Sequence, residues 1–298
     1  MKRFKTSEIT FKQKGDYMVN AQDLMSQDYA SVDINDTISQ LLGKMKLAKA
    51  HSAVVFDGKK YLGVLSKRFL LTSRIDPKKM KVHNIIKKRS KAKAQFFVPT
   101  LELSTPLKEI CKKMAAADVH MLPVLQKDKV IGIVSSHEVV KEIAAAYKGI
   151  ACQELASIPV TAKPSDGIYK AIDILSRNGI DHLPITDEQN KLIGMVAMSD
   201  LFENMNFWST SAQKISQAAS HQQGKHTGYA HGEKTKMSSL PIENCMSRKS
   251  ICCTAPETKI PEAVRLMDEN NVSNIVLVKS GKPVGILTIK DLLVDYAK

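Results

Sequence analysis

A unit of about sixty residues occurs four times in this chain of 298 residues. Each copy carries a glycine between apolar residues, in a stretch that follows one apolar run and precedes a helix start. The four glycine stretches are Leu62–Ser66, Ile131–Ser135, Ile193–Ala197 and Val284–Thr288. Such a repeat constrains the fold strongly, because each copy is one supersecondary unit that buries its apolar face against its neighbours.

The patterns around each glycine stretch predict the same elements in every copy. Apolar residues recur at helical spacing before it, as Ile168, Ile172 and Leu175 do in the third copy. Two short strands follow, separated by a polar turn such as Lys127-Asp128 in the second copy. A second helix begins directly after the glycine strand. The predicted fold class is therefore α/β (α+β), with units of strand, helix, strand, strand, helix.

These four glycine stretches and their flanking runs resemble the cystathionine-β-synthase (CBS) motif, over roughly residues 19–297. Two such motifs pair into a Bateman module. Four of them resemble archaeal tetra-CBS proteins and the γ subunit of AMP-activated kinase. The resemblance implies a basic N-terminal extension (1–18), CBS 1 (19–82), CBS 2 (83–150), CBS 3 (151–208), a flexible polar insertion (209–239) and CBS 4 (240–298), with repeats 1 and 2 in one module and 3 and 4 in the other.

The resemblance also implies nucleotide sites. CBS motifs that bind adenosine compounds carry Ser or Thr three residues after the glycine, to help with phosphate, and Asp six residues after it, to hold the ribose hydroxyls. The four copies carry Thr288 with Asp291, Ala197 with Asp200, Ser135 with Glu138, and Ser66 with Phe69, from the fourth copy back to the first. We therefore expect the third and fourth sites to be the best, the second weaker and the first inactive.

Residues just before the second strand often meet the phosphate in such modules, and here they include His120, His182 and His51, with no arginine. A nucleoside or monophosphate is therefore easier to accommodate than a triphosphate. A purely structural role is the alternative, because Thr288-x-x-Asp291 and Ser135-x-x-Glu138 also fit helix capping boxes. The predicted nucleotide-binding residues are Thr288, Asp291, Asp200, His182, Ser135, Glu138 and His120.

Charge is distributed unevenly along the chain. Residues 1–150 hold 28 Lys and Arg against 14 Asp and Glu, whereas the remaining residues hold 16 of each. Thirteen basic residues and one acid, Asp76, lie between Lys59 and Lys93. This pattern is typical of polyanion binding, and a solvated lysine-rich surface is the alternative. The basic cluster comprises Lys59, Lys60, Lys67, Arg68, Arg74, Lys78, Lys79, Lys81, Lys87, Lys88, Arg89, Lys91 and Lys93.

Two functions remain open at this point. In the first, the basic module docks on RNA or the ribosome while the second module senses an adenine nucleotide. In the alternative, the chain is an adenine-nucleotide sensor (AMP, ADP or ATP) that regulates a partner protein without nucleic-acid binding. We expect no enzyme activity, because no phosphate loop, dinucleotide fingerprint or nucleophile elbow occurs. We also expect no metal site, no required cofactor, no membrane span and a cytoplasmic location; a homodimer stays open.

Overall fold

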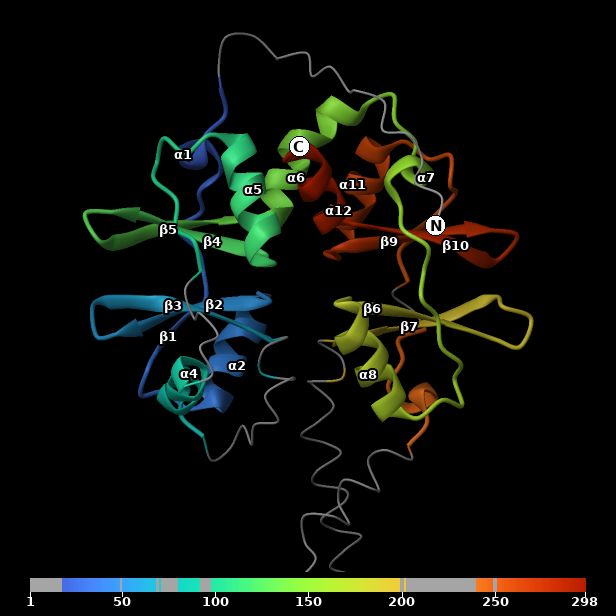
Figure 1. Cartoon of the computed structure of the whole chain (residues 1–298), viewed down its shortest axis with the longest axis horizontal. Helices are drawn as coiled ribbons and strands as arrows, with labels where there is room; N and C mark the ends of the chain where they lie inside the picture. The colour runs from blue at the N-terminus through green and yellow to red at the C-terminus, as the bar shows by residue number, and fades with distance from the viewer. Residues whose placement is uncertain are drawn as a thin grey trace, which may run out of the picture.

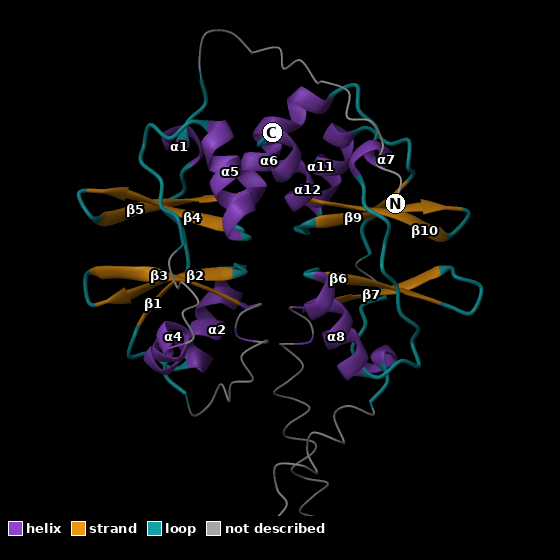
Figure 2. Ribbon diagram, in the orientation of Figure 1, coloured by secondary structure: helices purple, strands orange, loops and turns teal. Residues whose placement is uncertain are grey.

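The four repeats lie around one centre in the computed structural model (Figure 1). It describes residues 18–48, 50–67, 70, 80–91, 98–198, 201, 240–248 and 251–298, without the side chains of 87–91. The sheets of repeats 1 and 3 face those of repeats 2 and 4, and the helices cover the outer sides (Figure 2). The molecule is therefore a layered disc in which two layers of sheet lie between two layers of helix.

The first two repeats have the predicted element order. In each, a short parallel strand or bridge joins the second strand, which pairs antiparallel with the glycine strand. A helix then starts at the end of the glycine strand, as predicted. The elements are α1 (Ala21–Leu24), β1 (Ser31–Asp33), α2 (Ile38–Leu47), β2 (Ser52–Asp57), β3 (Lys60–Ser66), α4 (Val82–Lys91), α5 (Leu107–Ala117), β4 (Met121–Gln126), β5 (Lys129–Ser135), α6 (Ser136–Ile143) and the 3-10 helix η1 (Ala144–Tyr147).

The third and fourth repeats follow the same order. Their glycine strands again pair antiparallel with the strand before them. Among the described segments the elements are α7 (Cys152–Leu155), α8 (Ile168–Asn178), β6 (His182–Thr186), β7 (Leu192–Ala197), the 3-10 helix η2 (Ile242–Asn244), β8 (Cys253–Thr254), α11 (Ile260–Glu269), β9 (Asn274–Lys279), β10 (Lys282–Thr288) and α12 (Ile289–Tyr296).

The leading segment of each repeat packs on its partner repeat. Ser26, ahead of the first repeat's strands, bridges to Ile133 on β5 in the second, and Ile38 at the start of α2 donates its backbone N–H to Met80, ahead of α4. The same exchange joins Ser157 to Ile286 on β10. We call the stretches around Ser26 and Ser157 the crossing segments. They join repeat 1 to repeat 2 and repeat 3 to repeat 4, because each hydrogen-bonds to the glycine strand of the partner repeat.

The crossings give a physical reason for the glycine that marks the repeat. A Cβ on Gly132 would lie 2.8 Å from the carbonyl oxygen of Ser26, on the crossing segment. A Cβ on Gly194 would lie 2.7 Å from the sulfur of Met246, which lies ahead of the strands of the fourth repeat. At Gly132 the crossing backbone passes directly over the strand, whereas the nearest atoms at Gly194 and Gly285 belong to side chains.

Two hydrophobic cores join the modules. One core contains the inner faces of α5, α6, α11 and α12, so repeats 2 and 4 are packed together. Its centre includes the fully buried Tyr147, whose hydroxyl donates to Asp295 Oδ2 at 3.1 Å. The other core combines α2 of repeat 1 with α8 of repeat 3. The two modules of one chain thus pair with each other.

Helices of membrane-spanning character do not occur in the described part of the chain. None there is both long enough and apolar enough to cross a bilayer.

Candidate functional site

The second strands of all four repeats begin at the centre of the disc. They place His51, His120, His182 and Ser273 around a cavity of about 60 Å³, which Asp118, Asp181 and Lys67 also line. We call this the central cavity. Residues far apart in the sequence meet here because His51, His120, Asp181 and Ser273 occupy the same position in their repeats, and His182 directly follows Asp181. The predicted His120 and His182 are therefore brought together, with His51 beside them.

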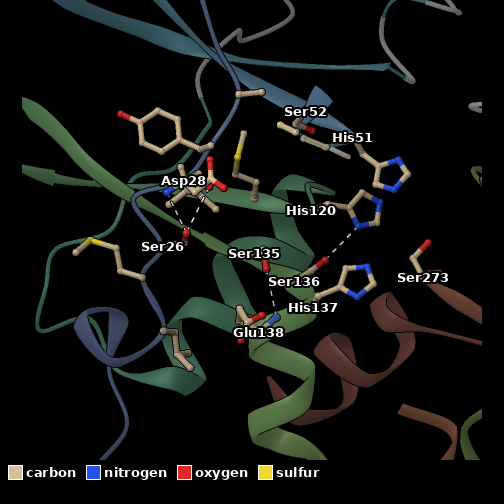
Figure 3. A pocket seen from close by; sticks show the side chains of 18 of the residues that line it. Ser26, Asp28, His51, Ser52, His120, Ser135, Ser136, His137, Glu138 and Ser273 are labelled. Atoms are coloured by element: carbon tan, nitrogen blue, oxygen red, sulfur yellow. Dashed lines mark hydrogen bonds between the residues drawn. The ribbon is translucent and has the colours of Figure 1, made fainter. Parts of the chain in front are cut away.

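A larger cavity of about 560 Å³ opens from this centre between repeats 1 and 2. We call it the first cavity, and Figure 3 shows it from close by. Its walls come from the crossing segment, the starts of β2 and β4, the end of β5 and the start of α6. Repeat 4 contributes as well. The polar lining comprises Asp23, Ser26, Asp28, Tyr29, His51, Ser52, His120, Ser135, Ser136, His137, Glu138, Asp268, Asn271 and Ser273.

The helix start in the first cavity carries the predicted Ser135 and Glu138. Ser135 caps α6, since its hydroxyl accepts the backbone N–H of Glu138 at 3.2 Å. The carboxylate of Glu138 does not return to close the capping box. It pairs with Lys141 at 2.7 Å, and Lys141 also lies 3.6 Å from Asp268. The serine half of the predicted capping box is therefore present at this site, and the glutamate half is not.

Three histidines gather on one side of the first cavity, next to Ser273 (Figure 3). The His120 ring lies 6.2 Å from that of His51, and its Nδ1 is 3.4 Å from the hydroxyl of Ser136. Surrounding protein atoms and the nearby His120 lower the pKa of His51 to about 4, although the ring faces two cavities. The same two causes lower the pKa of His137. His51 and His137 therefore line the cavity as neutral rings at pH 7.

A second cavity, of about 260 Å³, lies between repeats 3 and 4. One wall is apolar and includes Ile158 and Val160, which are 89% and 37% exposed. The helix start at Thr288 also lines it. The second cavity is lined by Asp118, His120, Ser157, Ile158, Val160, Asn178, Gly179, Ile180, Asp181, His182, Pro184, Ser273, Ile286, Thr288, Lys290 and Asp291.

Thr288 and Asp291 form a complete capping box in the second cavity. The hydroxyl of Thr288 accepts the backbone N–H of Asp291 at 3.2 Å, and the backbone N–H of Thr288 donates to Asp291 Oδ2 at 2.8 Å. The Thr288 hydroxyl also donates to that oxygen, at 2.7 Å. Burial raises the pKa of Asp291, and these hydrogen bonds oppose the rise. The capping interpretation is therefore correct here, and both described bonds use one carboxylate oxygen.

His182 lies at the inner end of the second cavity. Burial lowers its pKa to about 4, against the opposing effect of the Asp181 carboxylate. His120 Nε2 lies 3.8 Å from Asp181 Oδ2. Lys290 is paired with Asp118 at 2.7 Å. The inner end is thus rich in hydrogen-bonding groups, while Lys290 has its charge balanced.

Six of the seven predicted nucleotide residues line these two cavities, and Asp200 lies outside the described residues. The expected ranking gave the fourth site more weight than the second, yet the larger cavity belongs to the second. Sequence reasoning missed Ser136 and His137, which directly follow the predicted Ser135. It also missed Tyr29, Asp268 and Asn271, for which the sequence offers no local signal.

Most of the basic cluster lies outside the described side chains. Those of Lys59, Lys60, Lys67 and Lys81 are described. Lys59 and Lys60 lie at the turn between β2 and β3, whereas Lys67 faces the central cavity. Polyanion docking by this cluster stays a sequence prediction.

Solved structures share this fold over nearly the whole chain. Protein MJ1225 from Methanocaldococcus jannaschii, described as a proposed archaeal homolog of g-AMPK, superposes with a TM-score of 0.71 at 17% identity, covering 94% of this chain and 100% of that one. An uncharacterized conserved protein from Pyrococcus horikoshii gives 0.57 at 17% identity, covering 93% and 100%.

Curated relatives match at low identity. Uncharacterized protein MJ1404 of Methanocaldococcus jannaschii is 22% identical over 91% of this chain and 60% of its own length. Uncharacterized protein MJ1232 of the same organism is 26% identical over 35% of each chain. The chain thus covers less than two thirds of the length of these relatives.

The family itself follows from the repeats. The model of the CBS domain matches four segments, residues 21–68, 97–145, 153–206 and 242–297. These segments contain the four glycine strands and all the residues that line the first and second cavities. The chain belongs to the CBS domain family, with four CBS domains in series.

Proposed function

We propose that this protein is a regulatory sensor that binds adenosine compounds, one in the first cavity and one in the second. The observation that supports this most directly is the recurrence of one chemical arrangement. Each cavity has a hydroxyl and a carboxylate at a helix start, with histidine and serine at the inner end. A carboxylate accepts two hydrogen bonds from a ribose cis-diol, and a helix start favours phosphate.

The second cavity fits a nucleoside along its length. Ile158 and Val160 are apolar yet exposed, and a planar base packed against them would cover their surface. Asp291 lines the same cavity from a helix start, where Oδ2 holds the cap. Its other oxygen serves the ribose in this proposal. The ligand thus completes a site that already has its apolar and polar walls.

The first cavity supports the same ligand class with a different wall. Tyr29, two positions before β1, lines the first cavity where Ile158 and Val160 line the second. At about 560 Å³ the cavity lies within the range of small-molecule pockets, roughly 300–1,000 Å³. Glu138 is held by Lys141, so a ribose must compete for its carboxylate. We therefore propose that the first cavity is larger than the second but binds the ribose more weakly.

The charges favour small anions over large ones. Among the described residues, no Lys or Arg lines the first cavity, and Lys290 in the second is paired with Asp118. A triphosphate would bring its charge to groups that are neutral or acidic. Nucleosides and monophosphates are accordingly the proposed ligands, and ATP the disfavoured one.

Ligand binding has a route to a partner protein. Asp268, Asn271 and Ser273 of repeat 4 line the first cavity beside repeats 1 and 2. A ligand there contacts both modules, and it shifts their relative position if it binds one arrangement better than another. In this proposal the partner responds to that shift.

Calorimetry on the full chain tests this function. We expect two molecules of adenosine per chain. In the second cavity 2′-deoxyadenosine should bind more weakly by about tenfold or more, because a hydrogen bond to a charged group contributes roughly 1.5–3 kcal/mol. In the first cavity the loss should be smaller, because Lys141 already holds Glu138. Asp173→Asn, on the exposed face of α8 away from both cavities, is the matched control and should bind as the wild type does. Equal affinity for both nucleosides, or no binding, would reject the proposal.

A further inference from the structure

One lysine at the first cavity contacts carboxylates from both modules. Lys141, on α6 of repeat 2, lies 2.7 Å from the carboxylate of Glu138 on the same helix. The same ammonium group lies 3.6 Å from the carboxylate of Asp268, on α11 of repeat 4. Both helices contribute to the core that joins repeats 2 and 4. The ion pair with Asp268 therefore crosses from one module to the other.

Both carboxylates belong to the lining of the first cavity, and Lys141 does not. A ligand in this cavity therefore meets Glu138 and Asp268, while the lysine stays outside the lining. Between 39% and 46% of each of the three side chains is exposed. The contacts of Lys141 can thus change without any rearrangement of the core.

The fourth repeat has different residues at the corresponding positions. Val294 on α12 stands where α6 has Lys141. Ala115 on α5 stands where α11 has Asp268. The carboxylate of Asp291 is held within its own helix start instead. The second cavity therefore provides an internal comparison for the arrangement in the first.

A ligand that takes the Glu138 carboxylate leaves the charge of Lys141 to be balanced elsewhere. The hydrogen bond to Glu138 raises the pKa of Lys141, and the charge of Asp268 adds to the rise. Even an unperturbed lysine stays protonated near pH 7. A charge-assisted N–H···O bond measures about 2.7–2.9 Å, so Lys141 has less than about 1 Å to move to form one with Asp268. The flexible lysine stem permits this move.

We propose that Asp268 is a positioning residue of the first cavity, which accepts Lys141 when a ligand draws the Glu138 carboxylate away. This inference rests on the proposed function, because it assumes that an adenosine compound binds at Glu138. Asp268 makes Glu138 easier to free. Since Asp268 belongs to repeat 4, a ligand in the first module also strengthens a contact with the second module, and by linkage a stronger contact favours the ligand.

The test follows adenosine binding by calorimetry on the full chain carrying Asp291→Asn, in which the tighter step reports the first cavity. Adding Asp268→Asn should weaken that step about two- to fivefold, the effect of a half-exposed ion pair. Adding Asp268→Asn to the same chain with Lys141→Met should change nothing, because the group that Asp268 accepts is then absent. A merely structural role of Asp268 would not depend on Lys141 in this way.

Glu269→Gln is the matched control for Asp268→Asn. Glu269 is the next residue on α11, pairs with Arg265 and does not line the first cavity, so its loss of charge should leave adenosine affinity unchanged. In a chain that keeps Asp291, Asp268→Asn should also leave the second cavity unchanged, because Asp268 does not line it.

The outcomes separate the two claims. Unchanged adenosine affinity after Asp268→Asn would overturn the positioning role and leave the proposed function standing. A loss of equal size in the Lys141→Met chain would mean that Asp268 contacts the ligand itself, which would also overturn the positioning role. No adenosine binding by the wild type would overturn the proposed function and this inference with it.

Discussion

The two cavities occupy equivalent places in the two modules, yet they hold their carboxylates differently. In the second cavity Asp291 folds back onto Thr288 and completes the helix cap. In the first, Glu138 is one methylene longer and turns to Lys141, while Ser135 caps alone. Side-chain length does not by itself decide this, because Glu154 returns to the N–H of its own N-cap residue; the second repeat differs in carrying Lys141, where the fourth has Val294.

This difference separates a ready site from one that must rearrange. Asp291 keeps its place in the cap, so in the proposed function it is already oriented for the ribose. In the same proposal Glu138 must leave Lys141, or share it, before it accepts a ribose hydroxyl. The volumes favour the first cavity instead, because it measures about 560 Å³ and the second about 260 Å³.

The largest expected effect comes from removing the two carboxylate charges separately. Asp291→Asn should weaken adenosine binding in the second cavity by about 2–3 kcal/mol, the value of charged hydrogen bonds. Glu138→Gln should cost the first cavity about 1 kcal/mol or less, since Lys141 already occupies that carboxylate. Calorimetry on both variants measures the contrast. Equal losses would contradict the distinction between the two helix starts.

The next largest effect, on the stability of the fold, is expected at the glycines that lie beneath the crossing segments. Gly132→Ala places a methyl group 2.8 Å from the Ser26 carbonyl, and overpacking of this kind costs about 1–3 kcal/mol. Gly285→Ala meets only side-chain atoms, of Leu277 and Ala156, and should cost less. Chemical denaturation measures both. Gly149→Ala, with nothing within 4 Å of its Cβ, is the control, and a loss there equal to that at Gly132 would refute this cause.

Acidification probes the histidines of both cavities. His51 and His182 have pKa values lowered to about 4 in the folded protein, below the usual 6.5 of the unfolded chain. The unfolded state therefore binds more protons between pH 6.5 and pH 4, so stability falls as the pH falls through this window. His51→Gln and His182→Gln should each flatten the fall in urea melts between pH 7 and pH 4. An unchanged slope in either variant would show that its ring titrates normally.

The smallest effect should follow from releasing Glu138. Lys141→Met removes the partner that holds this carboxylate at 2.7 Å, and a half-exposed ion pair contributes about 1 kcal/mol or less. Adenosine should then bind the first cavity a few fold more tightly. The second cavity, which Lys141 does not line, should be unchanged. A loss of affinity in the first cavity would mean that Lys141 itself helps to bind the ligand.

Local chemistry in this chain could be predicted from the sequence. Thr288 and Asp291 lie within one helical turn, so their spacing predicted the cap, while the resemblance to CBS motifs predicted a nucleotide site there. The repeat predicted the fold because its glycine and apolar runs recur in order. The pairing of Glu138 with Lys141 was also within reach, since residues three apart on a helix are neighbours.

Long-range contacts could not be predicted in this way. Asp268 and Asn271 line the first cavity only because the helices of repeats 2 and 4 share a core. The convergence of His51, His120 and His182 likewise depends on how four repeats close into a disc. The sequence shows each of these residues, but which residues become its neighbours depends on how the modules pack together.

A crystal structure of the full chain grown with saturating adenosine tests the central claim most directly. The account predicts one adenosine in each cavity, with the ribose at Asp291 in the second and at Glu138 in the first. In the first cavity the Glu138 carboxylate should have turned away from Lys141. Two empty cavities at saturation, or adenosine bound elsewhere on the chain, would contradict the account.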